Sequence, residues 1–216
     1  MAVTVKICGL TSAEAAAAAA CAGAEYGGLV FHPASPRNLS LEQARAVSAT
    51  MAGKLKRVAL VADADDAALA AIIAAVQPEF LQLHGEESMA RTAEIRARFA
   101  LPIIKALPVA DADDLKATNA YAPLADMLLF DAKAPKGADR AGGHGVAFDW
   151  TLLQGRSFGK PWMLAGGLNP ENVARAIALS GAALVDVSSG VESAPGVKSA
   201  ERISQFIAAL RQPVQA

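Results

Sequence analysis

The stretch Trp162–Glu192, WMLAGGLNPENVARAIALSGAALVDVSSGVE, determines the fold. Its two short apolar runs, Trp162–Leu164 and Leu184–Val187, enclose a glycine turn and an alanine-rich segment. An apolar run followed by a helical segment and a second apolar run is the pattern of a βαβ unit, in which the two strands are parallel. In Asn169–Glu171 a capping residue is followed by a proline, which predicts that the helix starts at Pro170.

The same pattern recurs along the rest of the chain. Helix-start signals stand between the apolar runs, at Thr11 or Ser12, at Ser40 and at Asp111. Eight strand–helix units favour a single closed (β/α)8 barrel, an α/β fold, over the alternative of an open doubly wound sheet. We expect one domain over residues 1–216. The six earlier predicted strands are Val3–Cys8, Tyr26–Phe31, Lys56–Val61, Phe80–Leu83, Ile103–Ala106 and Met127–Phe130.

Composition argues against several classes of function. The net charge of −1 leaves no surplus of Lys and Arg, which a nucleic-acid or membrane-surface protein would need. The longest apolar run, residues 15–23, is too short to span a bilayer. Cys8 and Cys21 lack metal-type spacing, so we expect no metal site and a reducing, cytoplasmic location. Cys21, in the alanine-rich first helix, is expected to pack on the barrel.

The glycine turns after the last two predicted strands indicate a phosphate site. Glycine lets the backbone approach an anion closely, and the free N–H groups at a helix start point towards it. Loops after strands 7 and 8 are a frequent phosphate site in this fold. A third glycine cluster stands in the long loop after strand 6. The candidate residues are Gly166 and Gly167, then Ser188, Ser189 and Gly190, and in the third cluster Gly142 and Gly143.

Two further residues at strand ends suit acid–base chemistry. Cys8 ends strand 1 before a turn, so its thiolate could accept a proton at the barrel mouth if its pKa were lowered. Asp131 ends the apolar run Met127–Phe130, and a carboxyl group among apolar neighbours can hold a proton for delivery. A base and an acid across one cavity suit the isomerisation of a sugar.

Seven motifs, in their order along the chain, resemble those of the phosphoribosylanthranilate isomerase family of tryptophan biosynthesis, and they extend over nearly the whole sequence. The resemblance implies an Amadori rearrangement of N-(5′-phosphoribosyl)anthranilate to 1-(2-carboxyphenylamino)-1-deoxyribulose 5-phosphate, without cofactor or metal. The motifs are Lys6–Thr11, Phe31–Arg37, Gln82–Gly85, Phe130–Asp131, Gly142–Gly145 with Phe148–Trp150, Ala165–Leu168 and Asp186–Glu192.

The resemblance also implies roles for single residues. Cys8 becomes the general base at the sugar C2′, and Asp131 becomes the general acid at the furanose ring oxygen. Arg37 would hold the anthranilate carboxylate, a role that suits its planar charged fork. The three glycine-containing loops match those around the substrate phosphate. His144 departs from the pattern, because the family usually has Thr or Ser there, and we assign it no role.

Other functions remain open at this stage. The nearest enzyme alternatives are indole-glycerol-phosphate synthase, whose lysine and glutamate pattern is missing, and a dual-specificity sugar isomerase, which would have aspartate in place of Cys8. A non-catalytic protein that senses phosphoribosyl compounds is a different class. Cys8 and Asp131 argue against that class. The expected partner is the small-molecule substrate, and either a monomer or a homodimer fits the sequence.

Three further residues and one loop carry separate expectations. Lys6 lies two residues before Cys8 and therefore on the same face of the strand, and Asp186 interrupts the neighbouring eighth strand. Because neither charge should be buried alone, we predict a Lys6–Asp186 ion pair beneath the site that also favours the Cys8 thiolate. His84 is interpreted as a buried residue bonded to neighbouring loops rather than a substrate contact. The glycines, Lys133 and Lys136 of the loop over residues 132–145 permit closure as a lid, and the sequence leaves open whether the loop closes.

Overall fold

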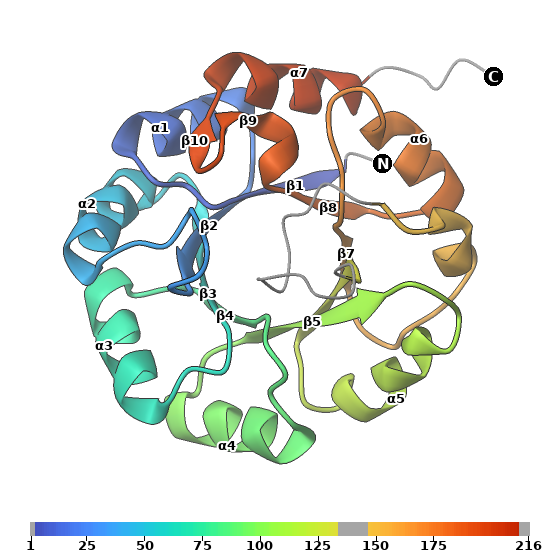
Figure 1. The fold of residues 1–216 in the computed structure, drawn as a ribbon, viewed down its shortest axis with the longest axis horizontal. Coiled ribbons are helices and arrows are strands. Elements are labelled where there is room, and N and C mark those ends of the chain that lie inside the picture. Colours follow the sequence, from blue (N-terminus) through green and yellow to red (C-terminus); the bar gives the residue numbers. More distant parts are fainter. Residues whose placement is uncertain (1–2, 134–146, 212–216) are drawn as a thin grey trace.

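A computed structural model describes residues 3–133 and 147–211 of the chain. Eight parallel strands form a closed barrel in sequence order, and the helices surround it (Figure 1). The predicted fold class is therefore confirmed. The strands are β1 (Thr4–Cys8), β2 (Tyr26–Phe31), β3 (Lys56–Val61), β4 (Phe80–Leu83), β5 (Ile103–Val109), β6 (Met127–Ala132), β7 (Trp162–Leu164) and β8 (Leu184–Val187).

The strand boundaries follow the apolar runs closely, with three differences. Five predicted strands match the structure residue for residue, and β1 starts one residue later than predicted. Strands β5 and β6 extend beyond their apolar runs because they pair with each other, with Pro108 opposite Asp131 and Val109 opposite Ala132. Asp131 consequently lies inside a strand, which fixes its backbone more firmly than a loop position would.

The barrel has an inner and an outer buried face, because side chains alternate along each strand. The helices cover the outer face, so both faces are apolar and the strands read as continuous hydrophobic runs. Polar side chains replace apolar ones towards the carboxyl ends of several strands, which is where the candidate site lies. The main cluster inside the barrel consists of Tyr26, Val58, Ile104, Ala106, Met127, Leu129, Met163 and Ala165.

Most helix starts follow their capping residues. Ser12 caps the first helix, and Ser40 forms a full capping box with Gln43 at the second. The start predicted at Pro170 is wrong: the Asn169 side chain accepts hydrogen bonds from two following N–H groups, but the regular helix begins only at Val173. The helices are α1 (Ala13–Ala22), α2 (Leu41–Met51), α3 (Asp66–Val76), α4 (Met89–Phe99), α6 (Val173–Ser180) and α7 (Ala200–Ala209).

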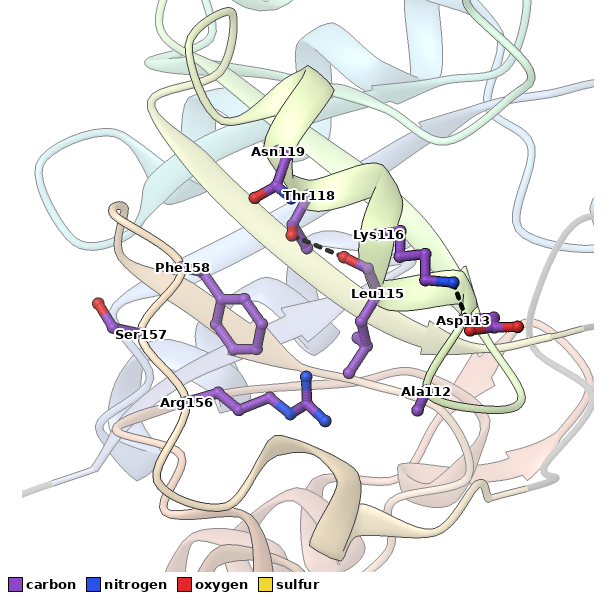
Figure 2. Close-up of a pocket in the computed structure, with 9 residues that line it drawn as sticks. All are labelled: Ala112, Asp113, Leu115, Lys116, Thr118, Asn119, Arg156, Ser157 and Phe158. Atoms are coloured by element: carbon purple, nitrogen blue, oxygen red, sulfur yellow. Dashed lines mark hydrogen bonds and ion pairs between the residues drawn. The ribbon is translucent and has the colours of Figure 1, made fainter.

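The helical layer is thin beside β5 and β6. The helix predicted from Asp111 is instead a 3-10 turn, η1 (Asp114–Ala117), followed by the short helix α5 (Thr118–Tyr121). A second 3-10 turn, η2 (Trp150–Leu153), precedes β7. A cavity of about 430 Å³ opens there, and Figure 2 shows Leu115, Arg156 and Phe158 pointing into the same space. This cavity lies in the helical layer outside the barrel and not at the strand ends.

No helix within residues 3–133 and 147–211 combines the length and the apolar character that crossing a bilayer requires.

Candidate active site

Cys8 lies on the inner face of β1, near the carboxyl end of the strand. The side chain is 4% exposed and packs against Val30 and Leu60. Gly28 on β2 makes room for it, because a Cβ atom at Gly28 would stand 2.9 Å from the Cys8 sulfur. The sequence prediction for Cys21 is wrong, since that cysteine is exposed on α1. Of the two thiols, only Cys8 belongs to the barrel interior.

The predicted ion pair beneath Cys8 is confirmed. Lys6 Nζ lies 2.9 Å from Asp186 Oδ1, and the Lys6 side chain is fully buried. Burial alone would lower the pKa of Lys6, but the negative charge of Asp186, joined by that of Cys8 when the thiol is ionised, raises it above its ordinary value. Lys6 is therefore a cation at the base of the site. Its side chain donates a hydrogen bond from β1 to Asp186 on the neighbouring strand β8.

The pKa of Cys8 differs from the sequence expectation. Burial raises the pKa of the thiol, and the nearby carboxylate of Asp186 acts in the same direction. The positive charges of Lys6 and Lys198 oppose this shift without reversing it. In the ligand-free protein Cys8 is thus mainly a thiol, and two buried cations stand ready to stabilise the thiolate.

Asp131 projects from the inner face of β6 and interacts with a histidine. His84, just after β4, places Nε2 3.2 Å from Asp131 Oδ2, and its Nδ1 lies 2.9 Å from Gln82 Nε2. The backbone N–H of Ala132 donates to Asp131 Oδ1 at 2.9 Å. The His84 side chain is 12% exposed. It is mostly buried, as predicted, but its partner is the candidate acid itself.

Arg37 is held by a carboxylate and is not a surface cation. Its Nε and Nη2 atoms donate to the two oxygens of Glu192 at 2.6 and 2.7 Å, and the residue is 5% exposed. Lys198 also pairs with Glu192 Oε1 and donates to the carbonyl oxygen of Ser188 at 3.2 Å. Among the described residues no group accepts from Nη1 of Arg37. A substrate carboxylate can therefore use that side of the guanidinium.

Glu192 and Lys198 are the site residues that sequence reasoning missed. They lie on a small hairpin formed by β9 (Glu192–Ala194) and β10 (Val197–Lys198), close to α1 and α7 (Figure 1). Glu192 stands in a recognised motif, yet nothing in its local pattern shows that a buried cation lies on each side of it. Burial alone would raise the pKa of Glu192, but hydrogen bonds from Arg37 and the charge of Lys198 lower it to about 2.

The glycine and serine turns after β7 and β8 enclose a pocket together with Asp131. Gly166 and Gly167 both have positive φ, and a Cβ atom at Gly166 would stand 2.4 Å from the backbone nitrogen of Ala132. A side chain here would thus collide with β6. The pocket is lined by Asp131, Ala165, Gly166, Gly167, Leu168, Asp186, Val187, Ser188 and Ser189.

The β8 turn supplies donors to this pocket. It contains the 3-10 turn η3 (Ser189–Val191). A Cβ atom at Gly190 would overlap the carbonyl oxygen of Leu168, so the turn after β8 is in contact with the turn after β7. Ser188 donates its hydroxyl to the Cys8 carbonyl oxygen at 3.0 Å. Within the described part of the chain, no protein group accepts from the N–H groups of Gly167, Ser189 and Gly190. These donors are available to an anion.

The third predicted glycine cluster cannot be compared in the same way. Gly142, Gly143 and His144, and with them most of the loop over residues 132–145, lie outside the described residues. The described start of that loop, Lys133, pairs with Asp114 in η1 at 2.9 Å.

Comparison with known proteins identifies the family of this chain. Residues 5–209 match the model of a family described as N-(5'phosphoribosyl)anthranilate (PRA) isomerase. A relative from Rhodopseudomonas palustris (strain BisA53), named N-(5'-phosphoribosyl)anthranilate isomerase, is 56% identical to this chain. The alignment spans 98% of this chain and 97% of the relative.

Solved structures agree as well. Phosphoribosyl anthranilate isomerase from Thermotoga maritima is 36% identical, with a TM-score of 0.85 over 97% of this chain and 98% of that one. Another structure holds the isomerase in complex with reduced 1-(o-carboxyphenylamino)-1-deoxyribulose 5-phosphate. It is 34% identical, with a TM-score of 0.83 and the same coverage. The family resemblance read from the motifs is confirmed, and this chain belongs to the N-(5'-phosphoribosyl)anthranilate isomerase family.

Proposed function

We propose that this chain converts N-(5′-phosphoribosyl)anthranilate to 1-(2-carboxyphenylamino)-1-deoxyribulose 5-phosphate by general acid–base catalysis. The observation that carries the proposal is the pocket in which Asp131 shares its walls with the glycine and serine turns of β7 and β8. A phosphate bound at those turns places the attached sugar against Asp131. Family membership supports the reaction, and the pocket supports the roles of the residues.

The first step is the opening of the ring. Asp131, as a carboxylic acid, donates its proton to the furanose ring oxygen. The bond between C1′ and that oxygen breaks, and the lone pair of the anthranilate nitrogen forms a C1′=N double bond. The product of this step is an open-chain iminium ion with a new hydroxyl group. Its positive charge acidifies the neighbouring C2′–H bond.

The second step is the removal of the C2′ proton by Cys8. The electrons of the C–H bond form a C1′=C2′ double bond, and the iminium nitrogen becomes neutral. The enolamine then gains a proton at C1′ and loses one from the C2′ hydroxyl, which gives the ketone. Burial raises the pKa of Cys8, so the charges of Lys6 and Lys198 and of the iminium ion all serve to stabilise the thiolate.

The third element of the proposal is the binding of the anthranilate carboxylate by Arg37. Glu192 occupies Nε and Nη2 of Arg37 and so fixes the plane of the guanidinium. A carboxylate that approaches Nη1 meets a charged donor that needs no reordering. Phosphate at one end and carboxylate at the other then hold the sugar between Asp131 and Cys8.

Turnover of the proposed substrate tests this function. We expect the wild-type protein to abolish the anthranilate-sugar fluorescence of N-(5′-phosphoribosyl)anthranilate. We expect Asp131→Asn to lower kcat by about 10²-fold or more, because an amide cannot donate the required proton. Binding of the reduced product analogue should be retained by Asp131→Asn. Absence of turnover by the wild type would refute the function, whereas near-normal turnover by Asp131→Asn would refute only the role of the acid.

A further inference from the structure

Gln82 contacts His84, the partner of Asp131, and has no role in the proposed mechanism. It is the inward-facing residue of β4 two positions before His84, and it is fully buried. Its Nε2 is 2.9 Å from His84 Nδ1, while its Oε1 is buried without a hydrogen-bond partner among the described residues. Burying an amide oxygen in this way is costly, so the position calls for a physical reason.

The contact with Gln82 determines which nitrogen of His84 carries the proton. An amide NH2 group can only donate, so His84 Nδ1 must accept and the proton of the neutral ring resides on Nε2. That Nε2–H group then donates to Asp131 Oδ2, 3.2 Å away. In this arrangement, which we name the Nε2–H arrangement, the histidine favours Asp131 as a carboxylate.

Rotation of the Gln82 amide by half a turn produces the opposite arrangement. Oε1 then accepts from an Nδ1–H group, and the bare Nε2 accepts a hydrogen bond from Asp131. In this Nδ1–H arrangement the histidine favours Asp131 as a carboxylic acid, the form that can protonate the ring oxygen. The rotation gives Oε1 a partner and moves the amide nitrogen to the former place of Oε1, so each orientation leaves one end of the amide without a partner among the described residues. Each amide orientation therefore matches one protonation state of Asp131.

Small neighbours make the contact between β4 and β6 possible. Strand β5 stands between them; its Ala106 pairs with Leu129 and is buried in the cluster inside the barrel, and its Pro108 pairs with Asp131. The alternation of side chains thus places Gln82, His84 and Asp131 along one continuous line within the barrel.

We infer that Gln82 is a positioning residue that couples the tautomer of His84 to the proton on Asp131. The inference rests on the proposed function, because it assigns the proton of Asp131 to the reaction. Asp131 loses a proton when the ring opens and must regain one before the next turnover. The rotating amide lets the same histidine stabilise both states without carrying a net charge itself.

Nitrogen-15 NMR of the histidine side chains tests the first half of the inference. The two neutral tautomers differ in their ring-nitrogen shifts, and His84→Asn identifies the His84 signals. We expect Gln82→Glu, whose ionised carboxylate only accepts, to place a proton on Nδ1 of His84. We expect Gln82→Met to abolish the preference for one tautomer. Unchanged His84 signals in both variants would overturn the inference, whatever their activity.

Steady-state kinetics test the second half. We expect Gln82→Met to lower kcat about tenfold, the change that corresponds to one lost hydrogen bond, with KM within about twofold. We expect Gln82→Glu to keep a higher kcat than Gln82→Met, because it keeps a hydrogen bond to a protonated Nδ1 of His84. A purely structural role predicts the reverse order, since a buried carboxylate disturbs the barrel more than methionine does.

A matched control exists on α4. Thr92 is fully buried, and its hydroxyl also has no partner among the described residues. Thr92→Val should leave both kcat and the His84 signals unchanged. If the tautomer shifts in the Gln82 variants while kcat does not, the coupling to catalysis is refuted. Failure of the proposed function is a separate result, because it shows in the wild type and in Asp131→Asn, which leave Gln82 intact.

Discussion

At the level of single residues, strand alternation explains the chemistry of Cys8. Lys6 and Cys8 project into the barrel from the same face of β1, and Asp186 meets Lys6 from β8. Burial raises the pKa of the thiol, but the fixed ammonium group below it makes the thiolate attainable in the reaction. A lysine that is fully buried can persist there only because its charge is paired.

The buried pair predicts a large cost when one partner is removed. Lys6→Met leaves the Asp186 carboxylate uncompensated, and we expect the free energy of unfolding to fall by about 3–5 kcal/mol. Urea denaturation measures the change. The control is Arg98→Ala, which removes the ion pair between Arg98 and Asp66. Because the Arg98 side chain is 64% exposed, we expect this variant to lower the free energy of unfolding by less than about 1 kcal/mol. Equal losses in the two variants would contradict our description of the pair.

At the level of elements, the β9–β10 hairpin ties the two ends of the site together. Glu192 holds Arg37, and Lys198 binds both Glu192 and the carbonyl oxygen of Ser188, which belongs to the phosphate turn. The Thr11 hydroxyl donates to the carbonyl oxygen of Gly196 and attaches the hairpin to the segment before α1. The hairpin thus sets the distance between Arg37, which is proposed to bind the substrate carboxylate, and the turns that are proposed to bind its phosphate.

The hairpin also predicts how stability depends on pH. The pKa of Glu192 falls from 4.5 to about 2 on folding, so this group stabilises the folded state above pH 4.5. The stabilisation is lost as pH falls from 4.5 towards 2. Between pH 6 and pH 3 we expect wild type to lose about 2 kcal/mol more than Glu192→Gln, as measured by urea unfolding at each pH. Identical losses would show that Glu192 is not paired in solution.

At the level of the whole molecule, the barrel was the most predictable feature. Five strands match the predicted runs residue for residue, because each strand is buried on both faces and therefore consists mainly of apolar residues. The helix predicted from Asp111 failed, because a single capping residue does not show whether the chain continues as a helix. The prediction that the helix before β8 starts at Pro170 was wrong for the same reason.

The candidate site was predictable mainly where a residue carries its own local signal. Cys8, Asp131 and the glycine turns stand out in the sequence because they interrupt apolar runs or form turns. Glu192 and Lys198 do not, since their importance comes from contacts with Arg37, a residue far away in the chain. The raised pKa of Cys8 depends on burial, a property of the closed barrel that local sequence does not express.

The measurement that tests the central claim most directly compares the two cysteines. Loss of N-(5′-phosphoribosyl)anthranilate fluorescence is followed for wild type, Cys8→Ala and Cys21→Ala at equal enzyme concentration. Because Cys8 is buried at the barrel mouth and Cys21 is exposed on α1, the two variants remove the same atoms from different places. We predict that Cys8→Ala lowers kcat by about 10²-fold or more, while Cys21→Ala stays within about twofold of wild type. Near-normal turnover by Cys8→Ala would contradict the account.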